Sequence, residues 1–482
     1  MADCNLAPLS PYVPTAEKPW NEQRVKHLYA RIGYGITAAE IPDILSKNPV
    51  EYIESLVDEA FNLPVFPKPD WADWKPGQFN EEDGTEHYII YTQFVTDWIN
   101  EKLKRPLRDK IALFWSNVLV TKFEDYYYAP FLYQYVTNLQ RNALGNYRTF
   151  IREMGLGDSM LIFLNGFQNN KWQPNENYAR ELFELFTLGL DNGYTENDIK
   201  ETARAFTGYN GADLENYIIY FTPFTHDNGL KTIFGETANF DYNGVIDLLF
   251  EKKGDLICRH ICGKIYRHFV NAEGNDNIIQ QLADIMLAND FELLPVFKAL
   301  FCSEHFFDAT EFNTHIKSHI EYFTGIIKQF NYTLNYEEGN AMIWYSSSLG
   351  QTYFDPVDVA GWKEDKSWID SGSLLVRWLY SEWMYGGLIW QNQDFVVSYL
   401  KNLTNNSNDV EFVVRTVVDQ FFVSGLASQA DYDRLLIAFK ADLPENYYEQ
   451  GLWNLDWEKD FICWQTNLLL NEMARLPDVT LC

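Results

Sequence analysis

The chain has 482 residues, which corresponds to two or three domains at roughly 150 residues each, and 46% hydrophobic with 22% charged residues is typical of a folded globular protein. Its 68 acidic and 38 basic residues give a net charge of −30, which disfavours nucleic acid and acidic membrane surfaces as partners and leaves cationic partners and divalent cations open. The high aromatic content of 16% predicts a core built from large rings or, alternatively, a surface that stacks against sugars or peptides.

The N-terminal residues 1–20 have neither a basic start nor an apolar run of signal-peptide length. No stretch of the chain reaches transmembrane length, so we expect no transmembrane segment. By default this predicts a cytoplasmic protein. Export by a route that the N-terminus does not show, or loss of a leader, is the alternative.

The spacing of apolar residues predicts helices over residues 20–35, 86–104 and 106–123. Thr37 followed by Glu40 has the pattern of a capping box, which predicts a further helix after the first. The helix over 106–123 carries an apolar stripe that we expect to be buried.

Residues 175–209, NENYARELFELFTLGLDNGYTENDIKETARAFTGY, are the expected functional centre. Asn175 is a good N-cap for a first helix, and Gly189 stands where a C-cap is expected. Thr195 with Asp198 predicts the start of a second helix.

The first of these helices carries a ladder of alternating charge made by Glu176, Arg180 and Glu184, with Glu181 beside it. One interpretation is a solvated face of ion pairs. The other is a shared pocket, because two carboxylates one turn apart can bind a divalent cation or divide acid and base roles. We assign no metal ligands and expect no cofactor, with a divalent cation as the open alternative.

Further along, THDNGLKTIFG places His226 and Asp227 beside a glycine turn, with Lys231 four residues later. A His–Asp pair in a loop can titrate near neutral pH. His226 acting only as a turn cap is an equally weighted interpretation.

Residues 216–235 are β-prone and predict a small hairpin between helices, and a second short β-prone patch covers residues 341–345. Helical spacing holds from 245 to about 328. Cys258 and Cys262 share a face of that region, and we interpret them as core residues rather than a metal clip.

The sequence therefore predicts a mainly α protein, a multi-helical body with small β-hairpin insertions. Residues 1–330 are predicted to form a helical domain that carries the signature segment and the insertion near 216–235. Residues 331–482 are predicted to form a C-terminal helical region packed on it, with one continuous domain as the alternative.

Several motifs occur in a recognisable order: HLYARIGYG at 27–35, LFWSNVLVT at 113–121, NENYAREL at 175–182, THDNGLKTIFG at 225–235 and DVAGWKEDKSWIDSGSLLVRW at 358–378. In this order they resemble the bacterial family known as domain of unknown function 1800. The likeness covers nearly the whole chain, and the central motif is long and specific.

The resemblance implies a largely helical fold and a bacterial protein whose gene often lies beside a gene for another, frequently exported family. By that analogy the cell envelope or the exterior is an alternative location, and the neighbouring product is a candidate partner. Outside the first helix, this chain also has residues in common with the family pattern, and they include Arg204, Lys231, Trp362 and Trp368. We expect these four residues to bind a substrate or a partner.

This chain departs from the family pattern at three positions where typical members carry histidine: Ser116, Val118 and Phe186. Asp370 stands in place of a usual asparagine. If those histidines bind metal or shuttle protons in typical members, this chain lacks that capacity.

Three functions fit the sequence, and whether the protein is an enzyme is left open. We favour a non-catalytic binding or assembly protein that acts with a protein or glycan partner. The alternative is a metal- or carboxylate-dependent hydrolase in which the helix over 176–184 works with His226 and Asp227. The third is a purely structural ion-pair lattice.

Overall fold

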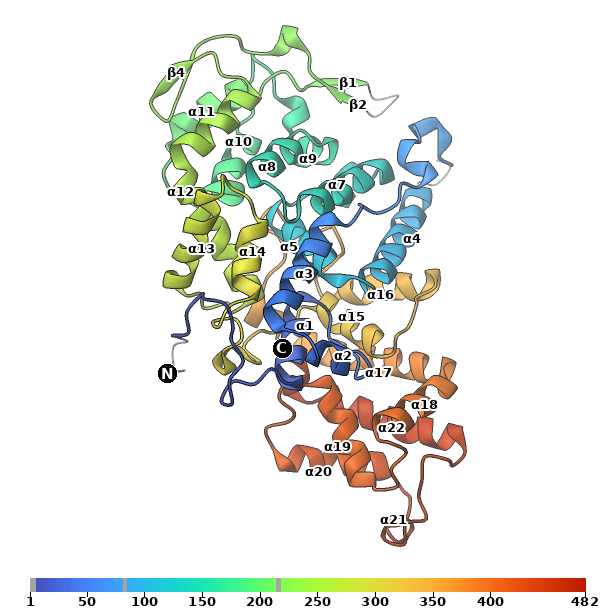
Figure 1. Cartoon of the computed structure of the whole chain (residues 1–482). Coiled ribbons are helices and arrows are strands. Elements are labelled where there is room, and N and C mark those ends of the chain that lie inside the picture. Colours follow the sequence, from blue (N-terminus) through green and yellow to red (C-terminus); the bar gives the residue numbers. More distant parts are fainter. Residues whose placement is uncertain (1–5, 81–84, 214–217) are drawn as a thin grey trace.

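The computed structural model describes residues 6–80, 85–213 and 218–482, which form a mainly helical protein with two small antiparallel hairpins (Figure 1). The predicted fold class is confirmed. No helix among the described residues has the length and apolar character needed to cross a membrane.

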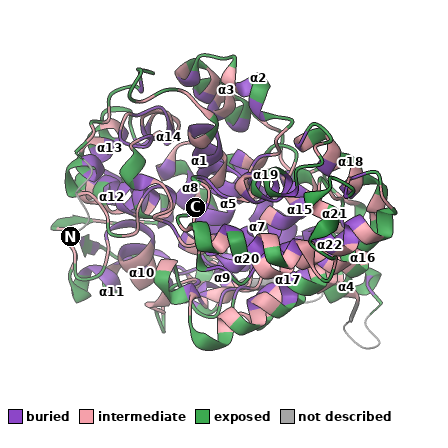
Figure 2. Cartoon of the chain, turned by 90° about the horizontal axis from the view of Figure 1, so that it is seen from below, coloured by how far each residue is buried: buried purple, intermediate pink, exposed green. Residues whose placement is uncertain are grey.

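The part of the chain before the signature segment forms short and medium helices. They are α1 (Glu22–Ile32), α2 (Ile41–Leu45), α3 (Pro49–Asn62), α4 (Thr85–Lys102), α5 (Pro106–Val118), α6 (Phe123–Tyr126), α7 (Ala129–Asn142), α8 (Tyr147–Gly155) and α9 (Asp158–Phe163). Helix α5 is buried along almost its whole length (Figure 2). The Thr37–Glu40 hydrogen bonds form as predicted, but α2 begins one residue after Glu40.

The signature segment and the region after it contain the next helices and all the described strands. They are α10 (Asn177–Glu181), α11 (Glu196–Ala205), β1 (Gly211–Asp213), β2 (Ile218–Tyr220), β3 (Lys231–Ile233), β4 (Glu236–Ala238), α12 (Tyr242–Phe269), α13 (Asp276–Ala288) and α14 (Leu294–Phe301). The single hairpin predicted near 216–235 is two hairpins, because β1 pairs with β2 and β3 with β4. Residues 214–217 lie outside the described residues.

The remaining helices are α15 (His319–Gln329), α16 (Tyr336–Ser348), α17 (Ser371–Gln391), α18 (Gln393–Leu403), α19 (Val410–Phe421), α20 (Gln429–Lys440), α21 (Asn446–Glu449) and α22 (Lys459–Met473). The β-prone patch predicted at 341–345 is wrong, because it lies inside α16. Asn335 and Glu338 form a capping box that starts this helix, and α16 packs against α4. Local capping and tertiary packing therefore outweigh β propensity here.

The hairpins lie at the upper end of Figure 1, α18 to α22 lie at the lower end, and the C-terminus returns to the middle near α1. One buried apolar cluster extends from Tyr12 to Val479. Gln329 and Gln420 both donate to the carbonyl of Ile36, at 3.0 and 2.7 Å. The predicted boundary near residue 330 stays a prediction.

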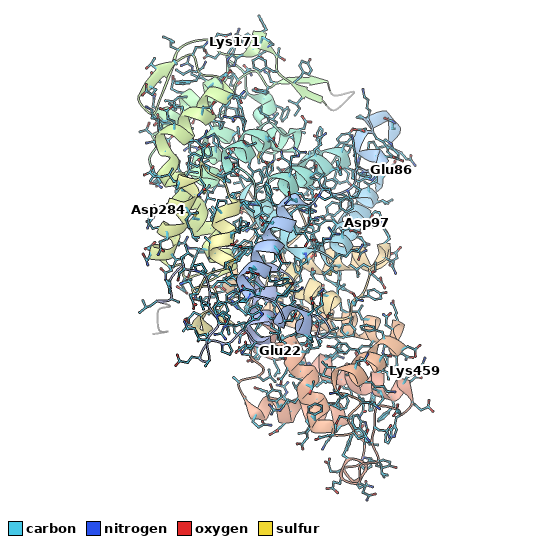
Figure 3. The ribbon with its side chains drawn as sticks, viewed as in Figure 1. Glu22, Glu86, Asp97, Lys171, Asp284 and Lys459 are labelled. Carbon is cyan, nitrogen blue, oxygen red and sulfur yellow. The ribbon has the colours of Figure 1, made fainter. Side chains whose placement is uncertain are left out.

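Charged side chains cover the outside of this core. Asp284 and Lys459, for example, project from the periphery of the molecule (Figure 3). Cys258 and Cys262 are both fully buried on α12, and Cys262 Sγ lies 3.9 Å from Met286 Sδ. Some charged groups are buried nonetheless, and Lys26, Lys110 and Glu321 among them line two adjoining cavities.

Candidate functional site

The signature segment is helical but does not form the regular helix that its spacing predicts. Asn175 Oδ1 accepts from Asn177 N at 2.9 Å, so α10 begins two residues after the predicted cap. After Glu181 the backbone widens into a π-helix, Leu182–Thr187. Such turns are rare and are frequent at functional sites.

Gly189 ends the π-helix with φ of +93°, which agrees with its predicted capping role. A Cβ at this position would lie 3.0 Å from Nδ1 of His260 on α12. Glycine is therefore required by both the backbone conformation and the close approach of the imidazole.

The predicted charge ladder is present and has one additional member. Arg180 lies 3.4 Å from Glu176 and 3.2 Å from Glu184, and it makes a closer bidentate pair with Glu196 of α11, at 2.9 and 2.8 Å. The hydrogen bond with Glu196 is the main cause that raises the pKa of Arg180. Arg180 is 32% exposed, so this network borders solvent.

Glu181 differs from its neighbours, since it makes no hydrogen bond or ion pair with any described residue. Burial raises the pKa of its carboxyl, and the nearby charge of Glu184 raises it further. A carboxyl group whose pKa is raised by burial and by a neighbouring charge is a candidate for acid–base chemistry.

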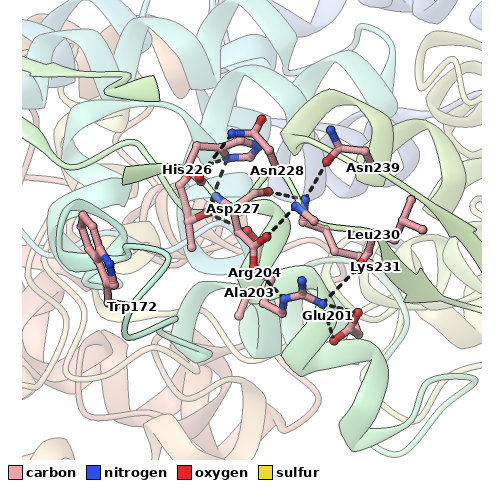
Figure 4. A network of polar contacts seen from close by, with 12 residues as sticks. Trp172, Glu201, Ala203, Arg204, His226, Asp227, Asn228, Leu230, Lys231 and Asn239 are labelled. Atoms are coloured by element: carbon pink, nitrogen blue, oxygen red, sulfur yellow. Dashed lines mark hydrogen bonds and ion pairs between the residues drawn. The ribbon is translucent and has the colours of Figure 1, made fainter. Parts of the chain in front are cut away.

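A second network joins α11 to the loop before β3 (Figure 4). Arg204 Nε donates to Asp227 at 2.8 Å, and its Nη1 donates to Glu201 at 2.8 Å. Glu201 also accepts from the backbone N–H of Thr232 at 3.0 Å. Burial by itself raises the pKa of Asp227, but hydrogen bonds from Arg204 and the N–H of Gly229 hold it below its usual value.

His226 and Lys231 complete this network. His226 Nδ1 lies 2.8 Å from the carbonyl oxygen of Thr207, and Lys231 Nζ donates to the carbonyl of Asp227 and to Asn239 Oδ1. Burial lowers the pKa of Lys231. These motif residues therefore fix the loop and the β3–β4 hairpin against α11.

The two networks stay separate: among the described residues no hydrogen bond or ion pair joins the Arg180 group to the Arg204–Asp227 group. The described part of the chain also contains no group of three or more His, Cys, Asp or Glu side chains placed to hold a metal ion. The structure thus does not gather Glu176, Glu184, His226 and Asp227 around one centre.

A different set of residues meets around two adjoining cavities, of about 80 and 40 Å³, which share Tyr34, Lys110 and Glu321. The smaller one is walled by the two tryptophans that the sequence singled out, Trp362 and Trp368, which are both buried. We name it the tryptophan cavity.

Two clusters of charged side chains line the tryptophan cavity, and only the one around Glu321 is buried, since the Glu364 side chain is 48% exposed. In one, Glu321 lies 3.0 Å from Lys110 and 3.6 Å from His315. Burial raises the pKa of Glu321, but the charge of Lys110 and the hydrogen bond with His315 together outweigh it and hold that pKa well below its usual value. Sequence reasoning missed this cluster, because the S-x-x-E pattern that contains Glu321 signals a helix cap and not burial.

In the other cluster, Glu364 accepts from Asn117 Nδ2 at 2.9 Å and lies 3.8 Å from His268. Asn117 Oδ1 also accepts from the backbone N–H of Trp362 at 2.5 Å. Asn117 thus ties α5 to the segment that carries the two tryptophans. The sequence motif around Asn117 was the only signal for this contact.

The structure reveals one further surface that the sequence did not mark. Five large apolar side chains on α16 and α17, each between 43% and 64% exposed, form what we name the α16–α17 face: Trp344, Leu375, Leu379, Trp383 and Trp390. A groove of about 110 Å³ lies beside Trp383, between the two helices.

The family model described as "Protein of unknown function (DUF1800)" matches residues 27–476. The chain belongs to the DUF1800 family. The resemblance that the motifs indicated is thereby confirmed. No curated protein and no solved structure matches the chain.

The three positions at which the family resemblance led us to expect histidine are buried in this structure. Ser116 Oγ donates to the carbonyl of Leu113 at 2.7 Å, and Val118 and Phe186 are core side chains. The hydroxyl of Tyr147 donates to the carbonyl of Phe186 at 2.6 Å. In this chain those positions serve packing.

Proposed function

We propose that this protein is a non-catalytic binding or assembly protein that docks a protein partner on the α16–α17 face. The observation that carries the proposal is the exposure of three tryptophans and two leucines on adjacent helices. Large contiguous apolar patches are uncommon on monomeric surfaces and mark interaction sites.

The shape of the face favours a protein over a glycan. Leu375, Leu379, Trp383 and Trp390 run along α17, whose 21 residues extend about 30 Å at 1.5 Å per residue. A protein–protein interface of standard size needs about 800 Å² per partner, and a face of this length can supply it. A sugar ring stacks on one or two aromatic side chains and has little use for exposed leucines.

The groove beside Trp383 provides an anchoring point. Tyr345, Met342 and Met384 line it, and the Tyr332 hydroxyl bridges Glu338 and Gln391 at 2.6 and 2.8 Å at its polar end. An apolar side chain of the partner fits such a groove, and tryptophans at a patch centre are typical hot spots.

The product of the gene beside this one is the first partner to test. We expect the two purified proteins to bind, and Trp383→Ala combined with Trp390→Ala to weaken the complex at least tenfold, since each tryptophan is worth about 2 kcal/mol or more at a hot spot. Trp172→Ala is the matched control, because Trp172 is also an exposed tryptophan and follows Lys171, which lies at the upper end of the molecule, away from α17 (Figure 3).

Isothermal titration calorimetry measures both affinities. Absence of binding by the wild-type protein, or an equal loss in the control variant, contradicts the proposal. Binding of soluble oligosaccharides that Trp383→Ala abolishes assigns the face to a glycan instead.

A hydrolase remains the second candidate, and it rests on the unpaired Glu181 with its raised pKa beside Glu184. Two neighbouring carboxyl groups in different surroundings can divide acid and base roles. Ester, peptide and glycoside substrates should then be turned over by the wild-type protein and not by Glu181→Gln. Metal content of protein prepared without chelator decides between a metal-dependent and a metal-free reaction.

A further inference from the structure

The exposed apolar residues of α17 follow one line along the helix. Leu375, Leu379 and Trp383 are spaced four residues apart, and Trp390 follows seven residues later. At 3.6 residues per turn these positions lie on one side of the helix, and we name them the α17 stripe. At 1.5 Å per residue the stripe is about 22 Å long, which suits a second helix lying along it.

Two consecutive glycines lie within the α17 stripe, between Trp383 and Trp390. Apart from the backbone of the helix itself, no atom of the described residues lies within 4 Å of a Cβ built at Gly386 or Gly387, and neither has a positive φ. Glycine inside a helix costs stability relative to alanine, and here neither the backbone conformation nor the packing of the chain requires it. A notch at this place lets the backbone of a partner approach closely.

The rings around the α17 stripe are held by contacts between the two helices. The ring centres of Trp344 on α16 and Tyr380 on α17 lie 5.4 Å apart, and those of Trp383 on α17 and Tyr345 on α16 lie 6.1 Å apart. A face that is already ordered loses little conformational entropy when a partner binds. Gly387 and Trp383 also line the groove of about 110 Å³, where an apolar side chain of the partner fits.

The charged residues of α16 and α17 are acidic with one exception. Glu337 and Glu382 are exposed and have no ion-pair partner among the described residues, and Glu338 lines the groove. The exception is Arg377, which is only 1% exposed. A docked segment therefore meets carboxylates and no exposed cation on these two helices, which favours a partner with lysine or arginine beside its apolar side.

Charge also disfavours the other occupants of an apolar face. A second copy of the chain, docked through the same face, would bring the glutamates of the two copies together, because a two-fold interface is self-complementary. An anionic membrane surface is repelled by Glu337 and Glu382 and by the net charge of −30. A basic helix has neither disadvantage.

We propose that the α16–α17 face binds a basic amphipathic helix of the partner, which lies along α17 with its apolar side on the α17 stripe. The two helices approach most closely at Gly386 and Gly387, and lysines or arginines of the partner lie near Glu337 and Glu382. This inference rests on the proposed function and adds the kind of segment that the partner supplies.

Three synthetic peptides of about 18 residues, or five helical turns, test the class of partner. The first has leucines at helical spacing on one side and lysines elsewhere, the second has glutamates in place of the lysines, and the third has the composition of the first in scrambled order. Fluorescence anisotropy with the full-length protein measures the Kd, and circular dichroism measures helix formation. The first peptide should bind as a helix at least tenfold more tightly than the others, and more weakly as salt is added. Equal binding of all three, or of none, overturns the inference.

The glycine notch is tested by Gly386→Ala combined with Gly387→Ala. Alanine has room at both positions and favours the helix, so the melting temperature should rise by about 1–2 °C. The added methyl groups fill the notch, so the Kd of the leucine–lysine peptide should rise about fivefold or more. Unchanged or tighter binding means that no helix crosses α17 there, which overturns the inference.

The carboxylates are tested by Glu337→Gln combined with Glu382→Gln. This pair should raise the Kd of the leucine–lysine peptide about threefold and reduce its dependence on salt. Glu54→Gln combined with Asp284→Asn, two exposed acids on α3 and α13, removes the same charge elsewhere and is the matched control. An equal loss in both pairs means that the net charge attracts the peptide and not the face, which contradicts the inference.

The product of the neighbouring gene separates this inference from the proposed function. If it binds through Trp383 and Trp390 but the leucine–lysine peptide does not compete with it, the proposed function stands and this inference fails. If neither the product nor the peptide binds, both fail. Dimerisation of the protein in sedimentation velocity, or binding to phosphatidylcholine vesicles, assigns the face to a second copy or to a lipid surface if Trp383→Ala abolishes it, and either result overturns the inference.

Discussion

At the scale of single residues, Lys102 is an unfavourable group in the core. It is fully buried, and its ammonium has no hydrogen-bond partner among the described residues. The ammonium lies 4.3 Å from the ring centre of Trp98, 4.6 Å from that of Tyr34 and 5.1 Å from that of Tyr353. Each of these cation–π contacts stabilises the ammonium by roughly 0.5–2 kcal/mol, whereas removing an unpaired ion from water into the core costs several kcal/mol of folding free energy.

Lys102→Met should therefore raise the free energy of unfolding by roughly 1–3 kcal/mol at pH 7. Burial lowers the pKa of Lys102 well below its usual value, so the unfolded state binds more protons and wild-type stability rises with pH up to about 10.4. The difference in free energy of unfolding between Lys102→Met and the wild-type protein should therefore become smaller as the pH rises toward about 10.4. Urea denaturation at pH 7 and pH 10 measures this difference. If Lys102→Met is instead less stable than the wild type, the contacts of the ammonium with the three aromatic rings are worth more than its desolvation costs.

Gly155, the last residue of α8, lies directly beneath two tyrosine hydroxyls. A Cβ there would lie 1.7 Å from Tyr178 Oη and 2.3 Å from Tyr242 Oη. Gly155→Ala should lower the free energy of unfolding by roughly 2–3 kcal/mol, because the core must shift to admit the methyl group. Gly77→Ala, with no atom within 4 Å of its Cβ, is the control for thermal melts. Equal melting temperatures in the two variants would contradict the close packing at Gly155.

At the scale of elements, the predictions that depend on a few adjacent residues are confirmed. The Thr195–Asp198 capping box forms and starts α11, and Arg180 contacts both Glu176 and Glu184. The π-helix over Leu182–Thr187 was not predicted, because the spacing of apolar residues does not distinguish it from an α-helix. Glu196 was missed as a partner of Arg180, since it belongs to the next helix.

The Arg204–Asp227 pair is the element-scale link between α11 and the β3–β4 hairpin. Asp227→Asn should lower the free energy of unfolding by roughly 1–2 kcal/mol at pH 7, since the Asp227 side chain is only 18% exposed and its hydrogen bonds are charge-assisted. The pKa of Asp227 is lowered in the folded protein, so its contribution is present above about pH 3.9 and is lost as the pH falls through the folded pKa.

Melting temperatures at pH 7 and pH 3 test this prediction, with the exposed Asp284→Asn as the control. The difference between Asp227→Asn and wild type should be present at pH 7 and smaller at pH 3. If both variants behave like wild type at pH 7, the motif does not serve as a structural link.

At the scale of the whole molecule, the contacts across residue 330 are buried and numerous. Asn100 exchanges two hydrogen bonds of 2.9 Å with the backbone of Leu334, and the Tyr91 hydroxyl donates to the carbonyl of Tyr353 at 2.8 Å. Both pairs join α4, from the first predicted region, to segments of the second. The two regions therefore complete a common core.

We expect the full-length protein to unfold in one calorimetric transition, and a fragment of residues 331–482 to lack the helical circular dichroism of the intact chain. The reason is that separation would expose the apolar surface that the two regions bury together. Two separate transitions, or a folded fragment, would instead establish the predicted boundary as a domain boundary.

The sequence by itself determined the mainly helical fold, the capping boxes, the Arg180 charge ladder and the family, because each of these depends on residue types within a few positions or on motifs in a fixed order. Only the tertiary structure decided which polar residues are buried. Asn117 and Trp362 are 245 residues apart, yet they share a hydrogen bond at the wall of one cavity. Periodicity carries no information at that separation, so the tryptophan cavity and the α16–α17 face became visible only in three dimensions.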